Sequence, residues 1–241
     1  MAAPELSSES THRKVDAAFA ELSGLTIGDE PLDDVLHRTA ALAKSVLRVP
    51  IEASVTLVGP AGATTPAFTA QPAYDLDQTQ YALGYGPCLA SAEAGQLVTI
   101  PDVATETRWP AFTQAALERN VRSTLSVPLP VQRQVIGALN LYAEDLAVFD
   151  TATEVIAERF GAYAAVAIAN AHLLLSASEL ADQMAQAMTS RAAIEQAKGV
   201  LMGERHCTAG EAFDILVNLS QTTHRKLRDV ASAVIEHVVA G

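Results

Sequence analysis

The distribution of proline and glycine constrains this chain more than any other feature of its sequence. All eleven prolines lie at or before Pro130, and the 37 residues between Gly161 and Gly199 contain neither proline nor glycine. Proline removes a backbone donor and glycine weakens a helix interior, so a stretch without them favours uninterrupted helix. The sequence therefore predicts a proline-punctuated first part and a helical second part.

Alternating patterns in the first part predict a sheet flanked by helices. Residues 11–23 and 31–48 have helical periodicity, and the segment between Tyr81 and Pro101 is expected to contain loop and a short helix. Strand patterns with many β-branched residues occur at 51–59, 65–70, 96–103, 121–131 and 134–144. This order of elements indicates an α+β sandwich built on an antiparallel sheet.

From Thr151 onward the pattern is helical. Apolar residues recur every seven positions, the spacing of a coiled-coil seam, at Leu173, Leu180, Ala187, Ile194 and Leu201. One helix over residues 151–202 would be about 75 Å long, too long for one small domain to cover. We therefore expect homodimerisation through this helix. The alternative is two shorter helices with a break near Ser176 or Ser178.

Charge is divided unevenly along the chain. Residues 186–241 contain six cations and six acids, so the whole net charge of −12 lies in residues 1–185. Such asymmetry suggests two parts with different partners. We find no apolar run of the roughly 18 residues needed to span a membrane, and no signal-peptide pattern at residues 1–14. Two distant cysteines suit a reducing compartment, so a cytoplasmic protein with no membrane partner is expected.

The C-terminal part carries a basic stripe. Arg191, Lys198 and Arg205 are seven residues apart and fall on one helix face. Spaced cations of this kind suit contacts to the phosphates of a nucleic acid. The alternative is a solvated helix surface on which Glu195 pairs with Lys198.

Two further helices are expected after the stripe. Thr208 and Glu211 have the spacing of a capping box that opens the second helix. Thr222 or Thr223 can cap the third, whose apolar face is expected to include Val238. Cations cluster where this third helix opens, at Arg225, Lys226 and Arg228.

The segments RAAIEQAKGVLM (191–202) and CTAGEAFDILVNLSQTTHRKLRDVASAVIEHV (207–238) resemble the ANTAR family of bacterial RNA-binding antitermination regulators. The resemblance implies a three-helix domain at 186–241 that binds paired RNA stem-loops as a dimer and so prevents a transcription terminator from forming. His206 stands where the family usually has glycine, so Gly203 is expected to end the first helix one turn earlier. The expected RNA-binding residues are Arg191, Gln196, Lys198, Arg205, Arg225, Lys226 and Arg228.

The segments LDQTQYALGYGPCLASAEAGQLVTIPDV (76–103) and RSTLSVPLPVQRQVIGALNLYAE (122–144) resemble the GAF family of small-molecule sensors. The resemblance implies a sensor domain at 30–165, with an antiparallel sheet of about six strands, helices on one face, and a pocket for an unidentified ligand on the other. Residues 1–29 then form a helical extension and 166–185 a coiled-coil linker. The candidate pocket residues are Cys88, Trp109 and Phe112.

Cys88 raises an alternative function. A thiol at a helix start has its pKa lowered by the helix dipole, and some GAF-like domains reduce free methionine sulfoxide with cysteines. The chain could then be a redox sensor or a reductase-like enzyme. Such enzymes usually need a second thiol nearby, and Cys207 lies in the other part, so a packing role for Cys88 is preferred. The spacing of the histidines predicts no metal site, and no catalytic residue or cofactor is expected.

Overall fold

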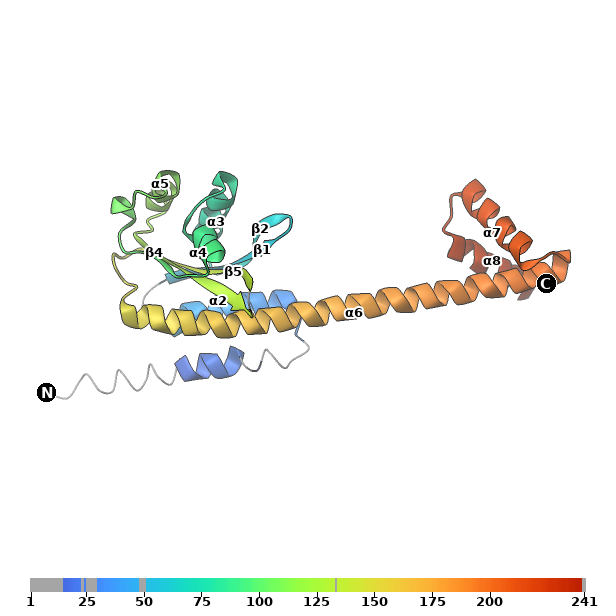
Figure 1. The fold of residues 1–241 in the computed structure, drawn as a ribbon, viewed down its shortest axis with the longest axis horizontal. Helices are drawn as coiled ribbons and strands as arrows, with labels where there is room; N and C mark the ends of the chain where they lie inside the picture. Colours follow the sequence, from blue (N-terminus) through green and yellow to red (C-terminus); the bar gives the residue numbers. More distant parts are fainter. Residues whose placement is uncertain (1–14, 23, 25–29, 48–50, 133, 240–241) are drawn as a thin grey trace. The chain divides into compact units, whose positions relative to one another are not determined.

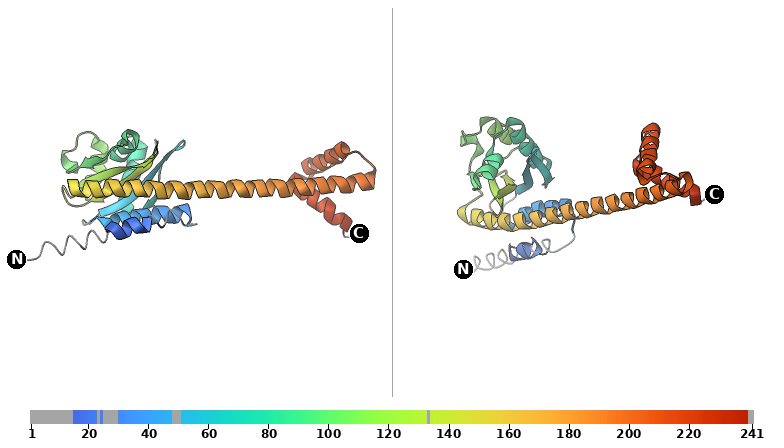
Figure 2. Two further views of the ribbon diagram at one scale, coloured as in Figure 1. Left: turned by 60° about the horizontal axis from the view of Figure 1, so that its bottom comes forward. Right: turned by 45° about the vertical axis from the view of Figure 1, so that its right-hand side comes forward.

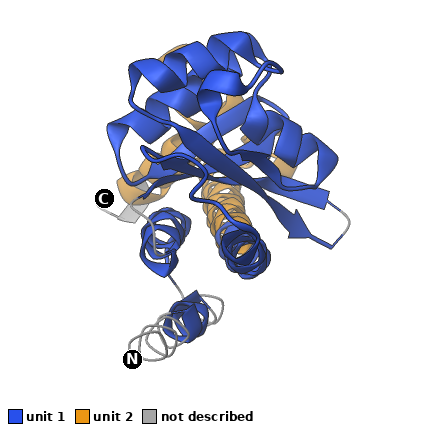
Figure 3. Cartoon of the chain, turned by 90° about the vertical axis from the view of Figure 1, so that its left-hand side faces the viewer, with its two compact units in different colours: residues 1–175 blue, residues 176–241 orange. Residues whose placement is uncertain are grey.

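The computed structural model of this protein describes residues 15–22, 24, 30–47, 51–132 and 134–239 (Figure 1). For Val238 and Val239 it describes the backbone alone, so the expected inward position of the Val238 side chain lies outside what is described. Residues 1–14, in which no signal peptide is expected, also lie outside the described residues. The chain divides into two compact units, unit 1 (residues 1–175) and unit 2 (residues 176–241), coloured separately in Figure 3. Each unit is described by itself.

Unit 1 contains a five-stranded antiparallel sheet with the strand order β2-β1-β5-β4-β3. Each of the five expected strand regions overlaps one strand, and β2 begins three residues before its predicted range of 65–70. β3 covers only three residues of the predicted 96–103, and among the described residues the sheet has one strand fewer than the roughly six expected. The strands are β1 (Ile51–Gly59), β2 (Gly62–Phe68), β3 (Val98–Ile100), β4 (Ser123–Val131) and β5 (Gln134–Ala143).

Helices cover both faces of this sheet, which corrects the expectation that they lie on one face only (Figures 1 and 2). On one face lie α2 (Leu32–Val46) and the first part of α6 (Thr151–Arg205). The other face carries α3 (Gln71–Leu83), α4 (Pro87–Ala94), η1 (Val103–Thr105) and α5 (Pro110–Glu118). The sequence patterns did not predict α3, and they did not predict α5, because the segment with Trp109 and Phe112 was expected to be a loop. Residues 15–22 are helical as expected, and the rest of the predicted helix at 11–23 lies outside the described residues.

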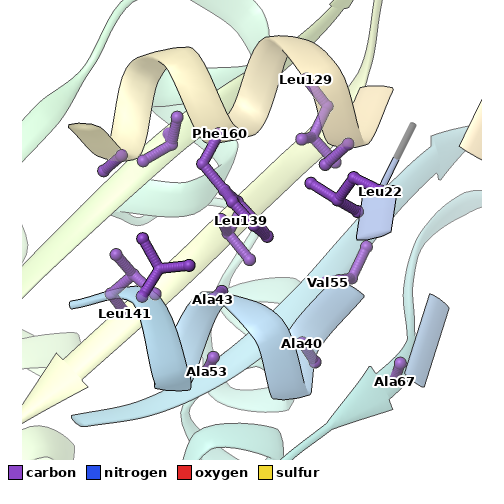
Figure 4. Packing of buried hydrophobic residues seen from close by; sticks show 14 of the residues in the cluster. Leu22, Ala40, Ala43, Ala53, Val55, Ala67, Leu129, Leu139, Leu141 and Phe160 are labelled. Atoms are coloured by element: carbon purple, nitrogen blue, oxygen red, sulfur yellow. The ribbon is translucent and has the colours of Figure 1, made fainter. Parts of the chain in front are cut away.

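The face under α2 and α6 is the apolar core of unit 1. Alternate residues of the strands, such as Val55, Leu139 and Leu141, point toward Ala43 of α2 and Phe160 of α6 (Figure 4). α6 approaches the sheet closely at Gly161, where an added Cβ would lie 2.7 Å from a Val127 methyl group. Burial of these side chains therefore fixes the first part of α6 against the sheet.

By length and composition alone, α6 contains an 18-residue window apolar enough to cross a membrane, and 39% of that window is buried inside the structure. This window corrects the expectation that no segment of the chain is apolar enough over such a length. In unit 1 its apolar residues cover the sheet instead, because Ala157, Phe160, Ala164 and Ile168 all belong to the core. A core helix passes the same hydropathy test as a membrane span, so the window by itself indicates no membrane contact.

Unit 2 is helical. The end of α6 packs with α7 (Ala209–Thr223) and α8 (Leu227–Val239) around a small core. The predicted capping box at the start of α7 is present, since Thr208 accepts from the Glu211 amide and the Glu211 carboxylate accepts from the Thr208 amide. The buried side chains of this core are Ala197, Leu201, Ala212, Leu216, Val230 and Ala231.

Two predictions about helix ends in unit 2 are wrong. Gly203 does not end the first helix: α6 continues to Arg205, and His206 itself adopts the left-handed conformation at φ 52°. Thr222 and Thr223 do not cap the third helix, because both lie in the last turn of α7 and donate to the carbonyls of Asn218 and Leu219. His224, at φ 54°, ends α7 in the same left-handed conformation.

Candidate functional site

The face of the sheet under α3 and α4 is buried but polar. Strand residues that alternate with the apolar core residues point to this side, because successive side chains of a strand face opposite ways. They include Ser54 and Thr56 of β1, and Asn140 and Tyr142 of β5. Ser54 and Asn140 are paired directly across the two strands. The sheet therefore carries a hydrogen-bonding surface inside unit 1.

Asp77 of α3 lies at the centre of this polar surface and is fully buried. Its Oδ1 accepts from the Tyr142 hydroxyl at 2.5 Å and from Asn140 Nδ2 at 3.1 Å, and its Oδ2 accepts from Thr65 Oγ1 at 2.9 Å. Tyr81 extends the network, since its hydroxyl lies 2.7 Å from Thr65 Oγ1 and 2.8 Å from Thr56 Oγ1. We call these residues, together with Gln80 and Cys88, the Asp77 cluster.

Burial controls ionisation in the Asp77 cluster. It raises the pKa of Asp77 to about 6, although hydrogen bonds from Ser54, Tyr142, Thr65 and Asn140 partly oppose the effect. No salt bridge of Asp77 occurs among the described residues. Burial and the nearby Asp77 carboxylate also raise the pKa of the Tyr142 hydroxyl.

Cys88 belongs to this cluster and is completely buried. Its backbone amide donates to Gln80 Oε1 at 2.8 Å, and Gly86 leaves room for that contact, since an added Cβ would lie 2.4 Å from the same oxygen. Burial, followed by the Asp77 charge, raises the pKa of the Cys88 thiol well above its ordinary value. The prediction of a pKa lowered by the helix start is therefore wrong, because desolvation outweighs the dipole of an eight-residue helix.

Two buried acceptor oxygens near the cluster have no hydrogen-bond partner among the residues that the structure describes. They are Oδ1 of Asn140 and Oγ1 of Thr124, which stands opposite Tyr142 in the neighbouring strand. Buried polar atoms are rarely left unpaired, so such atoms call for an explanation such as a bound molecule. The polar residues of β1 and β5 were missed in the sequence, although their alternation with apolar residues is visible there.

The other two candidate pocket residues lie in a separate apolar cluster. Phe112 is buried in α5 and packs with Leu76, Ile100 and Tyr142. Trp109 packs partly against this cluster, and the Arg108 guanidinium lies 4.3 Å from the centre of its indole ring. Both aromatic residues thus stabilise the layer that covers the Asp77 cluster, and Tyr142 connects the two groups.

In unit 2 the two outer residues of the basic stripe, Arg191 and Arg205, form no ion pair among the described residues, whereas the middle residue, Lys198, forms one. Arg191 is exposed, and its side chain makes no hydrogen bond or ion pair among the residues that the structure describes. The Lys198 ammonium, in contrast, lies 2.9 Å from a Glu195 carboxylate oxygen, and the Lys198 side chain is only 17% exposed. The alternative interpretation of the stripe, a Glu195–Lys198 pair, therefore holds for this one member.

Arg205 and Arg225 line one groove of unit 2, although twenty residues separate them in the sequence. His237 of α8 lines the same groove, and the sequence analysis had not singled it out. Arg225 is held in place because its carbonyl accepts from Ser220 Oγ at 2.6 Å. The apolar floor of the groove includes Leu201, Ile215, Leu219 and Val234.

The remaining candidate residues of unit 2 are exposed. Gln196 lies on α6, and Lys226 lies just before α8, where its carbonyl accepts from the Asp229 and Val230 amides. Arg228 is partly neutralised because its Nε lies 3.4 Å from Asp229 Oδ1. No group of three or more His, Cys, Asp or Glu residues suited to a metal ion occurs among the described residues.

Comparison with known proteins agrees with this division of the chain. The model of the GAF domain family matches residues 29–169, and the model of the ANTAR domain matches residues 182–235. The chain belongs to the GAF domain family and carries an ANTAR domain after it, which is the GAF–ANTAR architecture. No curated protein sequence matches the chain significantly.

Solved structures share the fold of unit 1. A free methionine-R-sulfoxide reductase from Neisseria meningitidis has a TM-score of 0.52 at 18% identity, with coverage of 66% of this chain and 90% of the other. The reduced form of a Staphylococcus aureus relative, named fRMsr, has a TM-score of 0.52 at 16% identity, covering 64% and 94%. A structure described as the GAF domain has a TM-score of 0.51 at 16% identity, covering 64% and 87%. At these identities the likeness establishes the fold alone.

A GAF sensor domain joined to an ANTAR domain is the architecture of a signal-responsive regulator. The ANTAR domain implies RNA binding, and the GAF domain implies a small-molecule ligand. The basic surface of unit 2 and the Asp77 cluster of unit 1 are therefore the two candidate sites for these roles.

Proposed function

We propose that this protein is a cytoplasmic regulator that binds paired RNA stem-loops as a homodimer and acts by transcription antitermination. The observation that carries the proposal is the exposure of Arg191, Arg205 and Lys226, whose side chains have no acidic partner among the described residues. Unpaired cations on an ANTAR domain suit contacts to RNA phosphates. The neutral net charge of residues 186–241 favours local contacts to folded loops over the broad basic surface that duplex DNA requires.

The Asp77 cluster is the proposed ligand site of the sensor domain. Its support is the combination of a buried carboxylate with the unpaired acceptors of Asn140 and Thr124. A ligand that donates hydrogen bonds to these acceptors would offset the cost of leaving them unpaired. Cys88 contributes a backbone contact and packing in this proposal, and no catalytic residue is assigned.

Residues 166–185 are the proposed linker between a sensor domain at 30–165 and an RNA-binding domain at 186–241. Pairing of two chains through residues 151–202 would bring two basic surfaces to one RNA. Two linked sites bind more tightly than one because the second contact becomes intramolecular. Ligand binding in the sensor domain would regulate this pairing.

The test is filter binding of an RNA with two linked stem-loops to the full-length chain over a range of salt concentrations. The double variant Arg205→Ala, Lys226→Ala should weaken binding and reduce the salt slope by roughly 0.7–0.9 for each phosphate that the variant no longer neutralises. Arg38→Ala, which removes an exposed arginine of unit 1, is the matched control and should change neither value. Equal binding by all three proteins would reject unit 2 as the RNA surface.

The alternative function, a thiol-based redox sensor or a reductase-like enzyme using Cys88, has weaker support. Solved reductases share the fold of unit 1, but the buried Cys88 has a raised thiol pKa. A buried thiol is slow to ionise and to react. A Cys88→Ser variant should retain its RNA affinity and its ligand response in the presence of an oxidant; a thiol-dependent turnover that disappears in this variant would favour the alternative.

A further inference from the structure

Part of α6 in unit 2 lacks any covering element among the described residues. Residues 176–189 are all exposed, and they include three large apolar side chains: Leu180 is 58% exposed, Met184 60% and Met188 72%. An isolated helix of this length is marginally stable in water. The segment therefore gains stability from whatever covers its apolar side.

The apolar side of this segment has coiled-coil spacing. Steps of three and four residues along α6 connect Ala177, Leu180, Met184 and Ala187, which we call the seam. In a heptad lettered abcdefg, Ala177 and Met184 occupy position a, and Leu180 and Ala187 occupy position d. Such a repeat is complementary to itself, so a second copy of the same chain fits it.

The next core position after the seam is charged. Continuing the heptad places Arg191 at position a, seven residues after Met184. Arg191 forms no salt bridge among the described residues, and the acid one helical turn further on, Glu195, is bound to Lys198. The apolar seam of the helix and its basic stripe thus share one heptad position.

We propose that a second copy of this chain covers the seam in parallel, so that the two Arg191 side chains meet and oppose pairing until an RNA polyanion lies against them. The proposal rests on the proposed function, which supplies the RNA. Parallel pairing is chosen because it puts both basic surfaces at the same end of the seam. The consequence is that RNA binding and self-association are reciprocally coupled.

The buried area of the seam is small, so self-association is sensitive to the two Arg191 charges. Fourteen helical residues are about 21 Å long, and a strip about 10 Å wide on two copies totals roughly 420 Å². Stable interfaces bury about 1,200–2,000 Å². The seam alone gives weak self-association, so one pair of like charges at its end has a large influence on the equilibrium.

The two equilibria should respond to salt in opposite directions. Salt screens the repulsion between two Arg191 side chains and therefore strengthens self-association of the RNA-free chain. The same salt weakens RNA binding, since counterion release then contributes less free energy. Because each chain has a net charge of −12, salt also screens repulsion between the two chains as a whole, so the contribution of Arg191 is the part of the salt dependence that its removal abolishes.

The first experiment measures self-association of the full-length chain by sedimentation equilibrium between about 0.05 and about 0.5 M salt, together with RNA binding. Arg191→Leu should tighten RNA-free self-association by about tenfold or more, reduce its increase with salt, and weaken RNA binding. Lys226→Ala is the matched control and should weaken RNA binding with no change in self-association. If Arg191→Leu leaves self-association unchanged while RNA still binds, the inference is wrong and the proposed function stands. If no variant of unit 2 affects RNA binding, the proposed function fails instead.

A second experiment tests the seam and its direction. Leu180→Ser should weaken self-association, whereas Leu175→Ser, at an exposed position off the seam, should not. In a Cys207→Ser background, Ala187→Cys should form a disulfide between two chains under mild oxidation, because a core d residue faces its own copy only in parallel pairing. Gln186→Cys, which faces away, is the control. Equal crosslinking of both cysteines, or of neither, would contradict the parallel seam.

Discussion

Asp77 in unit 1 and Arg191 in unit 2 differ in their exposure to solvent and in their hydrogen-bond partners. Asp77 is fully buried and receives hydrogen bonds from three strand residues, so its negative charge is suppressed by burial and partly restored by those donors. Arg191 is exposed and has no partner among the described residues. A buried group of this kind can respond only to a proton or a small molecule, whereas an exposed cation can contact a polymer. Within one chain, burial therefore separates the two kinds of recognition.

The largest expected effect is the loss of the buried carboxyl. Asp77→Ala should lower the free energy of unfolding of unit 1 by about 3–5 kcal/mol at pH 5, because Tyr142, Asn140 and Thr65 lose a buried hydrogen-bond partner. Denaturant unfolding followed by circular dichroism measures the change. Asp75→Ala, on the same helix but partly exposed, is the control and should cost less than about 1 kcal/mol. Equal costs for the two variants would show that burial does not distinguish these carboxyls.

Because Asp77 is buried, the stability of unit 1 should decrease as the pH rises. The pKa of Asp77 is about 6 when folded and 3.8 when unperturbed, so the folded state binds more protons between these values. Unit 1 should therefore lose up to about 3 kcal/mol of stability as the pH rises from about 4 to about 6, and little more above that. The measurement is the wild-type unfolding free energy minus that of Asp77→Asn at each pH. A difference that rises with pH in this window would contradict the burial argument.

Within unit 2, an unpaired cation should contribute more to RNA binding than a cation that is already paired with an acid. Arg205→Ala should weaken RNA binding by about tenfold, while Lys198→Ala should weaken it by about threefold or less. The reason is that the Lys198 ammonium already neutralises Glu195 in the free protein. Filter binding at one fixed low salt concentration measures both constants. A larger loss from Lys198→Ala would mean that RNA displaces Glu195 from the lysine.

The smallest expected effect concerns the Glu195–Lys198 pair itself. Glu195→Gln should change the stability of unit 2 by less than about 0.5 kcal/mol, because ion pairs on helix surfaces contribute little. It should also strengthen RNA binding about twofold to threefold, since an acid is removed and Lys198 is released. Thermal unfolding and filter binding measure the two changes. A stability loss above about 1 kcal/mol would show that the pair holds the end of α6 in place.

Periodicity made several elements of this chain predictable. The strand regions of unit 1, the long helix and the Thr208–Glu211 capping box follow from local patterns that depend on a few neighbouring residues. The helix α3 was missed because its residues, QPAYDLDQTQYAL, mix polar and apolar types on both sides. That same mixture places Asp77, Gln80 and Tyr81 against the polar face of the sheet. Of the helices that the sequence did not predict, α3 is thus the one that carries residues of the candidate ligand site.

The two-part division, the class of each part and the heptad phase shared by the seam and Arg191 all follow from the amino-acid sequence. These properties depend on the order of residues and on the fixed geometry of helices and strands. Only the tertiary structure decided which polar residues are buried together, which cations are already paired, and that Cys88 has a raised rather than a lowered pKa. The physical reason is that ionisation and hydrogen bonding depend on neighbours that are distant in sequence, and on how completely these neighbours exclude water.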